Sequence, residues 1–562
     1  MNLRKAVSFA GLLLYAGIVN AQTVPVGTVS VEDYYRRAQL LGHLDSTISF
    51  TVRPLHPTSF GKADVFYPDV MEQKYNLLET DSRFISKDGR LEVSYLPLRL
   101  QTQFNSHHPY GWNDGAMIPA KGLQTLFSAG VFAKYGPLTI QLNPEVVIAG
   151  NARFETFNNN HYDVIVARYY DFYNKIDQPV RFGDSEYSKA YWGQSSIRLN
   201  YSALSIGLST ENLWWGPGMR NSLLMSNNAP GFKHLTFNTL RPIKTPIGSF
   251  EGQLIAGRLE GSGFGPLEPN RNYFGSELYL LKPTDWRYLS GLVFTWQPKW
   301  VPGLFVGLTR SSQTYSKNLS GIHDYLPLFS SIKKVNADTP INKRDERTSM
   351  FFRWLWTEEQ AEVYFEMGHN NFSGDLRDAI LEPNSSRAYI FGLRKLLPFN
   401  HSSEENIMVN VEVTQMAETS VEKIKTASGW YTSEGIPHGY TNKGEVLGAG
   451  IGPGSNLQSL EVSWVKGLKK LGLQIERYLH NDDFYYYAYL DSKDPRRHWT
   501  DISLSAHGEW NFKNFIFNAK LQGIKSLNYQ WYLDKDIVSD TYWVNGKDVF
   551  NFQVQAGLTY RF

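Results

Sequence analysis

The sequence offers three arrangements of residues that could do chemistry, and none is complete. His480, Asp482 and Asp483 are close enough to suggest a metal site, but no helix face or paired-histidine spacing supports one, and a solvated loop explains them. The alternate glycines from 448 to 454 are similar to a nucleotide-binding loop, yet Pro453 and Ser455 stand where its last glycine would fall. A Ser/His/Asp triad needs no local motif. A hydrolase therefore stays open as an alternative, although nothing points to one, and we expect no catalytic residue, no metal and no cofactor.

The first residues predict export from the cytoplasm. Arg4 and Lys5 precede an apolar run from Ala6 to Val19, and Val19 to Ala21 form a cleavage site of small residues. We interpret residues 1–21 as a signal peptide, with a single uncleaved anchor helix as the alternative. The chain has no cysteine, which excludes a lipoprotein anchor, disulfides and thiolate metal sites.

Composition narrows the class of protein. The 56 basic and 54 acidic residues nearly balance, so we expect no nucleic-acid partner. After the signal no apolar run approaches the roughly 18 residues that a membrane helix needs, and the mean hydropathy is −0.36. Tyr, Phe and Trp make up 14% of the chain, a share that suits membrane girdles and carbohydrate contact. The absence of a Pro-, Ser- or Gly-rich linker favours one large closed architecture.

The last segment, from Phe550 to Phe562, alternates with a period of two. Its even positions are apolar and often aromatic, and its odd positions are mostly polar. This is the period of a strand with one apolar and one polar face. The segment resembles the terminal strand of outer-membrane barrels, although a soluble sandwich could end in the same way.

The same alternation recurs from Leu91 onward, and its polar face is charged again and again. A sandwich core would not tolerate buried unpaired charge, whereas a membrane barrel places lipid outside and a wet or plugged lumen inside. We expect the inner face to include Gln553, Gln555, Arg561, Glu412, Glu461 and Glu509. Counting the segments predicts about 18 strands. They begin near Leu91, Gly122, Leu138, Gly193, Leu204, His234, Ser249, Trp286, Leu304, Arg347, Ala361, Arg387, Asn406, Leu457, Leu471, Trp499, Phe515 and Phe550.

The connections between these segments support a barrel independently. Short turns, such as Gly136-Pro137 and Ser202-Ala203, alternate with long connections, such as 151–192 and 417–456. Short periplasmic turns and long extracellular loops are typical of outer-membrane barrels. Six tryptophans fall near the short-turn ends, where we expect a girdle at the lipid headgroups: Trp296, Trp300, Trp354, Trp356, Trp464 and Trp510.

We therefore predict an all-β protein: a transmembrane antiparallel β-barrel over residues 89–562, closed by pairing of the last strand with the strand near Leu91. Its outer face should contact outer-membrane lipid, and its biogenesis should need the barrel-assembly machinery. Residues 22–88 are expected to form a small, mainly helical periplasmic element. In it Ser30 would cap a helix that ends at Gly42, and Val70 to Thr80 would form a second, weaker helix.

The third long connection carries a resemblance to a known family. It contains Glu211-Asn212-Leu213-Trp214-Trp215-Gly216-Pro217-Gly218 and, further on, Ser226-Asn227-Asn228-Ala229-Pro230-Gly231-Phe232. Together with Tyr110 to Gly115 and the neighbourhood of Arg53 to Leu55, these segments resemble the Wzi capsule-assembly family of outer-membrane proteins. The resemblance implies a barrel with a periplasmic helical element that acts as a surface lectin and helps attach or organise capsular polysaccharide. It implies no catalysis. The loops depart from the proteobacterial pattern, which leaves the polysaccharide open.

A lectin needs aromatic rings for the apolar faces of sugars, and donors and acceptors for their hydroxyls. The candidates for glycan binding are Trp112, Asn113, Asp114, Glu211, Trp214, Trp215, Arg220, Asn227 and Asn228. Gly216-Pro217-Gly218 demands a fixed turn, so Trp214 and Trp215 could instead plug the lumen. Weaker candidates are Trp430, Tyr431 and Tyr485 to Tyr487.

We interpret Arg258 and Glu260 as an ion pair in the lumen. The functional hypothesis is a non-enzymatic outer-membrane lectin that binds capsular or other surface polysaccharide. The alternative is an outer-membrane channel for a solute or glycan.

Overall fold

The computed structural model describes residues 23–60, 65–68, 83–157, 161–325, 343–370, 386–400, 402–418, 429–489, 498–532 and 547–562. The expected signal peptide and the expected helix from Val70 to Thr80 lie outside these residues. No helix in the described ranges has the length and apolar character needed to cross a membrane.

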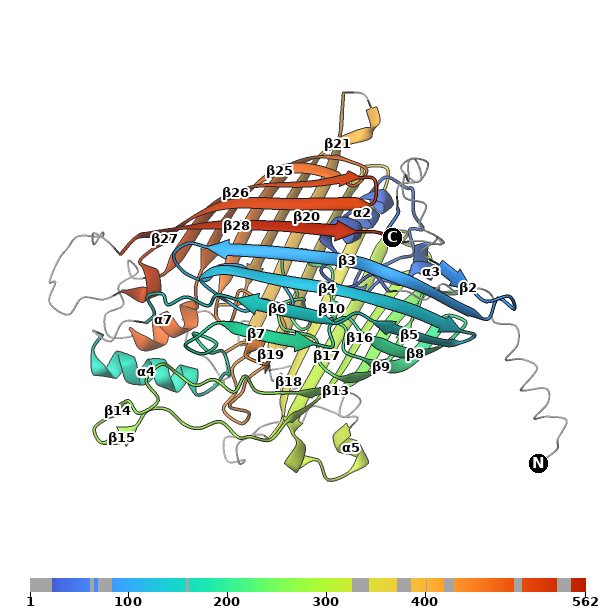
Figure 1. The fold of residues 1–562 in the computed structure, drawn as a ribbon. Helices are drawn as coiled ribbons and strands as arrows, with labels where there is room; N and C mark the ends of the chain where they lie inside the picture. Colours follow the sequence, from blue (N-terminus) through green and yellow to red (C-terminus); the bar gives the residue numbers. More distant parts are fainter. Residues whose placement is uncertain are drawn as a thin grey trace.

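Eighteen antiparallel strands close into a barrel within the described part of the chain (Figure 1). Three of them consist of two collinear pieces: β5 with β6, β7 with β8, and β11 with β12. The barrel strands are β3 (Leu91–Asn105), β4 (Gly122–Tyr135), β5 (Leu138–Leu142), β6 (Glu145–Ala149), β7 (Tyr187–Tyr191), β8 (Ser196–Tyr201), β9 (Leu204–Ser209), β11 (His234–Thr239), β12 (Ile243–Thr245), β13 (Gly248–Leu259), β16 (Arg287–Pro298), β17 (Leu304–Tyr315), β18 (Asp345–Trp356), β19 (Ala361–Asn370), β20 (Arg387–Phe399), β21 (Ser402–Gln415), β24 (Asn456–Lys466), β25 (Lys469–Leu479), β26 (Thr500–Phe512), β27 (Phe515–Leu527) and β28 (Val549–Tyr560). A short strand, β2 (Arg83–Ile85), extends the sheet beside β3.

The predicted strand count is confirmed, and most strands begin within about two residues of the predicted positions. The largest displacement concerns the strand predicted to begin at Gly193, which starts at Tyr187. Gly193 has a positive φ of 56° and lies in the break between β7 and β8. Glycine adopts a positive φ without steric cost. Gly193 therefore occurs at the irregularity in the middle of this strand, and not at the start of the strand.

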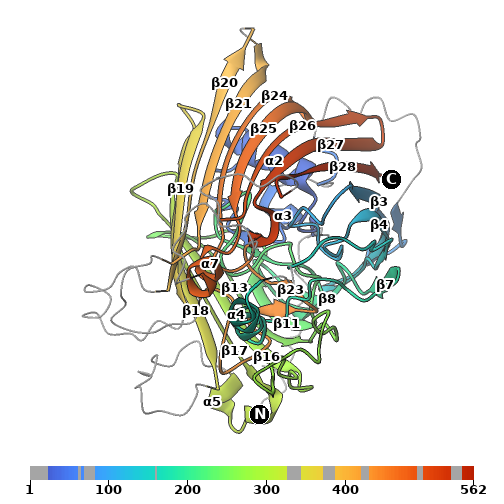
Figure 2. The same cartoon turned by 90° about the vertical axis from the view of Figure 1, so that its left-hand side faces the viewer.

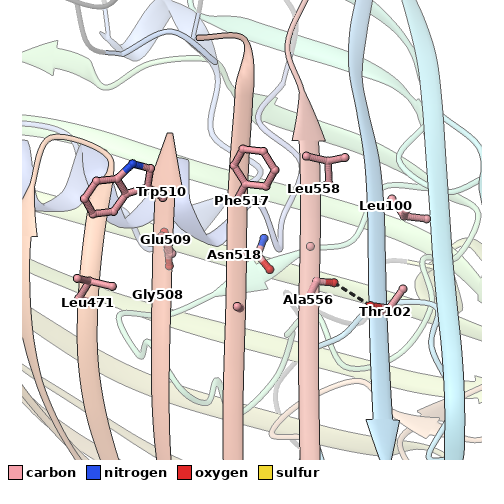
Figure 3. A pocket seen from close by; sticks show the side chains of 12 residues that line it. Leu100, Thr102, Leu471, Gly508, Glu509, Trp510, Phe517, Asn518, Ala556 and Leu558 are labelled. Carbon is pink, nitrogen blue, oxygen red and sulfur yellow. Dashed lines mark hydrogen bonds between the residues drawn. The ribbon is translucent and has the colours of Figure 1, made fainter. Parts of the chain in front are cut away.

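The terminal strand closes the barrel as predicted. β28 pairs with β27 on one side and with β3 on the other, from Gln553 opposite Asn105 to Tyr560 opposite Leu98. Gln553 and Arg561 face the interior and are buried, whereas Phe550 and Phe552 are exposed on the outer surface. Figure 3 shows this seam from outside, with the Thr102 hydroxyl donating to the Ala556 carbonyl at 3.3 Å.

The outer surface has the apolar character of a membrane-facing wall. Outward residues of neighbouring strands, such as Leu100, Leu558, Phe517 and Trp510, lie in a row across the seam (Figure 3). The six tryptophans near the short turns form pairs with ring centroids 5.0 to 6.4 Å apart. Trp300 is 66% exposed. These positions agree with an aromatic girdle at the lipid headgroups.

The N-terminal segment lies inside the barrel, near the short turns (Figure 1). It contains α2 (Val29–Leu40), β1 (Val52–Arg53) and α3 (Pro57–Phe60). The expected capping by Ser30 is wrong: the helix begins at Val29 after Thr28, and Glu32 accepts a hydrogen bond from the Gly27 amide at 3.0 Å. Most side chains of α2 are buried, because the polar barrel wall surrounds them.

Long connections cover the opposite end of the barrel. Figure 2 looks onto this end, and α4, α7 and β23 lie across the opening. The elements of these connections are β10 (Trp214–Trp215), α4 (Asp163–Tyr173), β14 (Asn272–Tyr273), β15 (Ser276–Glu277), η2 (Ser316–Asn318), α5 (Ile322–Tyr325), β22 (Thr441–Asn442), β23 (Glu445–Val446), α7 (Asp482–Ala488) and η5 (Tyr529–Trp531). Part of this material folds inward and fills the middle of the lumen with a hydrophobic core that includes Trp215, Leu223, Trp430, Tyr431 and Val446.

Candidate functional site

The third long connection, residues 210–233, folds back into the lumen. Glu211 at its start is fully buried and forms an ion pair with Arg198 of the wall at 2.6 Å. The Ser209 hydroxyl donates a further hydrogen bond to the same carboxylate at 2.9 Å. Because its oxygens are occupied by the barrel wall and by Thr23 of the N-terminal segment, Glu211 anchors the loop to both.

The two adjacent tryptophans of this connection have different surroundings. Trp215 is fully buried, and its indole nitrogen donates to the Gln253 side chain at 2.8 Å. Its backbone pairs with Val52, so the N-terminal segment and the loop share a two-stranded sheet, β1 with β10. Trp214 stacks under the guanidinium of Arg53 at 5.0 Å. Trp215 therefore belongs to the hydrophobic core that fills the lumen, which we call the plug, whereas Trp214 borders a cavity described below.

Arg220 joins the loop to the opposite wall. Its guanidinium donates to Glu476 at 2.6 Å, and its backbone amide donates to Glu412 at 3.1 Å. The same guanidinium lies 5.1 Å from the centre of the Trp112 ring. This contact brings together two candidates that are about a hundred residues apart in the sequence.

The asparagines connect the first and third long connections. Asn227 donates to the Asn113 carbonyl at 2.9 Å and accepts a hydrogen bond from Asn212 at 2.8 Å. Asn228 donates to the Val446 carbonyl at 3.1 Å and is buried. These side-chain amides satisfy backbone groups of irregular loops that no strand could pair.

Six of the nine candidate residues border one internal cavity of about 330 Å³. They are Trp112, Asn113, Asp114, Trp214, Arg220 and Asn227. The cavity lies between this group, the start of α2 and the inner face of the strands around the seam, which contributes Arg99, Lys470, Glu461 and Glu509. Glu211, Trp215 and Asn228 do not border it.

Three buried polar side-chain atoms of the candidate residues that border this cavity have no hydrogen-bond partner among the described residues. They are the indole nitrogens of Trp112 and Trp214 and the side-chain oxygen of Asn113. Buried polar groups are normally paired, so these two donors and one acceptor mark a place where a polar molecule is expected. The arrangement of two rings, two donors and one acceptor suits a polyhydroxylated ligand.

Two carboxyl groups of the loops have perturbed acidity. Burial raises the pKa of Asp114 to about 7. Burial, reinforced by the charge of Asp114, also raises the pKa of Glu445 well above its usual value. Asp114 therefore carries a proton below about pH 7.

The weaker candidates divide between the plug and the surface. Trp430, Tyr431 and Tyr485 are buried, so they pack within the long connections. Tyr486 and Tyr487 are exposed by 41% and 47% on α7. A helix is present here although the sequence pattern indicated only a loop; Asn481 caps it by accepting from the Phe484 amide at 3.1 Å.

The interpretation of Arg258 and Glu260 as a pair inside the lumen is partly wrong. The two side chains do pair, at 3.4 Å, but they are 51% and 40% exposed. Arg258 follows the outward alternation of β13 and lies over the Trp286 ring at 5.3 Å. The strand has reached the rim of the barrel here, so the pair borders a second, surface pocket.

That surface pocket has a volume of about 460 Å³ and was not predicted from the sequence. Its lining includes Tyr191, Trp192, Lys233 and Lys443 as well as Arg258 and Glu260. These residues come from four separate segments, so spacing along the chain could not reveal them. Within the described ranges, no three His, Asp or Glu side chains gather as metal ligands would.

Comparison with known proteins decides the family. The model of the family Capsule assembly protein Wzi matches residues 121–513, which is more than half of the chain. This chain belongs to the Wzi capsule assembly family. It is an outer-membrane β-barrel. A search of curated protein sequences gives no match.

One solved structure agrees with this fold. The chain is similar to Wzi of Escherichia coli, an outer-membrane protein involved in group 1 capsule assembly and a carbohydrate-binding β-barrel, with 12% identity and a TM-score of 0.58. The match covers 96% of this chain and 99% of that one. OccAB3 of Acinetobacter baumannii is more distant, with 9% identity, a TM-score of 0.38 and 84% and 99% coverage. OccK7 of Pseudomonas aeruginosa has 8% identity, a TM-score of 0.37 and 83% and 98% coverage.

Proposed function

We propose that this protein is a non-enzymatic lectin that binds capsular or other surface polysaccharide at the outer membrane and helps attach or assemble it on the cell. Membership of the Wzi family supports a role in capsule assembly. The similar Escherichia coli structure is a carbohydrate-binding barrel, which supports carbohydrate as the ligand class.

The observation that carries the proposal is the cavity between the first and third long connections. Trp112, Trp214 and Asn113 border it, and their two indole nitrogens and one side-chain oxygen are buried without a hydrogen-bond partner among the described residues. We assign the six residues that border this cavity as an inner sugar site, with Tyr486 and Tyr487 as outer contacts. Glu211, Trp215 and Asn228 hold the plug in place and do not touch the sugar.

A glycan array probed with the purified full-length protein tests this proposal. We expect saturable binding to a subset of glycans, and weaker binding by the variant Trp112→Phe, which keeps an aromatic ring but removes the donor. The matched control is Trp300→Phe, because Trp300 lies at the short-turn end on the outer surface. Equal binding by the wild type and both variants would contradict the inner sugar site. Binding to no glycan would contradict the lectin function.

The competing function is a channel for a solute or glycan. Conductance in a planar bilayer separates the two, because a lumen filled by the hydrophobic core around Trp215 and Trp430 should pass little current. A steady open pore would favour the channel.

A further inference from the structure

The barrel wall has a notch between β7 and β13. β9 ends at Ser209 and β11 begins at His234, and both of these residues lie level with Ser196 at the start of β8. β9 and β11 therefore do not extend beyond this level. β7 lies beyond it, so the places beside β7 that these two strands would fill contain no strand among the described residues. In the described part of the chain β7 pairs only with β6, so its other edge has no strand neighbour.

The backbone groups along an unpaired strand edge need hydrogen-bond partners, which water or other parts of the protein can provide. Backbone amide and carbonyl groups that face hydrocarbon are strongly disfavoured, and irregular backbone is tolerated in membrane proteins only where it lines a wet cavity or is covered by protein. The pocket of about 460 Å³ lies in this notch, within the usual size range of small-ligand sites. The notch is therefore a recess in the wall that is lined by polar and aromatic side chains.

The side chains around the notch combine positive charge with aromatic rings. Lys233, Arg258 and Lys443 provide three cations, against the one carboxylate of Glu260. Glu260 lies 3.4 Å from Arg258 and 3.6 Å from Lys443, so it holds two of the cations side by side. The backbone of Lys443 also donates to the Glu260 carbonyl at 2.9 Å, which fixes the β22–β23 hairpin to the rim.

The rings lie beside these charges. Trp192 is 64% exposed, and Tyr191 has the Lys443 ammonium 5.0 Å from its centre. Outward charges on a barrel are costly near the middle of the bilayer and nearly free of cost at its interface. The exposed positions of Lys233 and Arg258 thus favour a notch that opens at the headgroup level or beyond it.

We propose that this notch is a subsite for an acidic sugar residue, one that bears a carboxylate or a phosphate, in the polysaccharide that the protein binds. The cations pair with the acidic group, Tyr191 or Trp192 covers the apolar face of the ring, and Glu260 accepts hydrogen bonds from hydroxyls. A phosphate headgroup of a lipid would pair with the cations, but it would make no contact that requires the rings of Tyr191 and Trp192 or the carboxylate of Glu260. The inference rests on the proposed lectin function and specifies its ligand as acidic.

The test uses the full-length protein in detergent on an array that carries hexuronate-, sialate- and phosphate-bearing oligosaccharides beside neutral ones. We expect wild-type binding to favour the acidic glycans and to weaken with salt. The double variant Arg258→Gln/Lys443→Gln should bind them at least about tenfold more weakly, because it loses two charge-assisted contacts. The matched control is Arg477→Gln/Lys525→Gln, since Arg477 and Lys525 are exposed on the outer face and both lie next to Ile502 near the long-loop end.

The outcomes separate the subsite from the lectin itself. Two results would contradict the acidic subsite but not the lectin function. One is unchanged binding of acidic glycans by the notch variant, and the other is wild-type binding that is equally strong for neutral and acidic glycans. Binding to no glycan would overturn both. A notch variant that lost binding only to lipid A micelles would replace the sugar by a lipid headgroup. Heat-modifiable migration on gels verifies that each variant is folded.

Discussion

At the scale of residues, the loop tryptophans Trp112 and Trp215 show what the sequence could and could not predict. Both stand in glycine-rich loops, and composition made both candidates for sugar contact. The structure buries Trp215 against Gln253 of another strand and leaves Trp112 at a cavity under Arg220. Alternation does not extend into loops, so the sequence predicts an aromatic cluster but not the direction of each ring.

Trp215→Ala should destabilise the plug by about 3–5 kcal/mol, since it removes a fully buried indole and leaves Gln253 without its donor. Denaturant titration of intrinsic fluorescence in lipid vesicles measures the change. Trp300→Ala is the control, because that ring is 66% exposed and should cost far less. Equal losses in the two variants would contradict the assignment of Trp215 to the plug.

Asp114 should make the plug less stable as pH rises. Its folded pKa, raised by burial to about 7, lies above the ordinary value of 3.8, so the folded chain retains a proton that the unfolded chain has released. The free energy of unfolding therefore falls between about pH 4 and pH 7, and is unaffected by this group below that window. Asp114→Asn should remove that part of the slope in denaturant titrations at a series of pH values. An unchanged slope would show that folding does not raise the pKa of Asp114.

At the scale of elements, α2 is held in the lumen by buried charges. Glu362 of β19 accepts from Arg36 of α2 at 2.7 Å and from Arg353 of the wall at 2.6 Å. Asp33 of α2 pairs in turn with Arg394 at 3.0 Å. The charged inner face was predicted from the alternation, but its use as a socket for the N-terminal helix was not, because a polar strand face does not reveal its partner.

Glu362→Ala should loosen α2 and raise the conductance of the barrel in planar bilayers. The substitution leaves two buried arginines without their carboxylate, at a cost of about 3–5 kcal/mol. Glu405→Ala breaks a more exposed pair with Lys466 and should cost little stability, so it should leave conductance unchanged. Wild-type conductance from the Glu362 variant would mean that the loops alone close the lumen.

Deletion of Phe562 should lower the yield of inserted barrel. Phe562 packs against Tyr95 of β3 and Tyr560 of β28, with ring centroids 5.3 and 5.0 Å away, so it sits at the closing seam. The folded fraction in membranes can be measured by heat-modifiable migration, with Phe562→Tyr as the variant that retains the ring. Normal accumulation of correctly inserted protein after removal of the whole last strand would defeat the closed-barrel account.

The strands were the most predictable elements because a lipid-facing wall imposes a strict period of two. The prediction that one strand begins at Gly193 was wrong for a local reason. The two pieces of that strand, β7 and β8, are separated by a break in which Gly193 has a left-handed conformation. The notch beside β7 was not predictable. It depends on where β9 and β11 stop relative to their neighbours, which is a matter of register and not of composition.

At the scale of the whole molecule, the barrel is a wall around a folded interior. The N-terminal segment enters near the short turns, and the third long connection and residues 429–456 descend from the other end to meet it at the β1–β10 sheet. In this arrangement, packed side chains fill much of the lumen. That use of the lumen favours binding over transport through it.

The most direct test of the lectin proposal is the binding of the purified full-length protein to the surface polysaccharide isolated from its own cells, measured by surface plasmon resonance on immobilised polysaccharide. We expect saturable binding that falls as salt is added and that Trp112→Phe weakens while Trp300→Phe does not. Absence of binding beyond that of an unrelated outer-membrane barrel of similar size would contradict it.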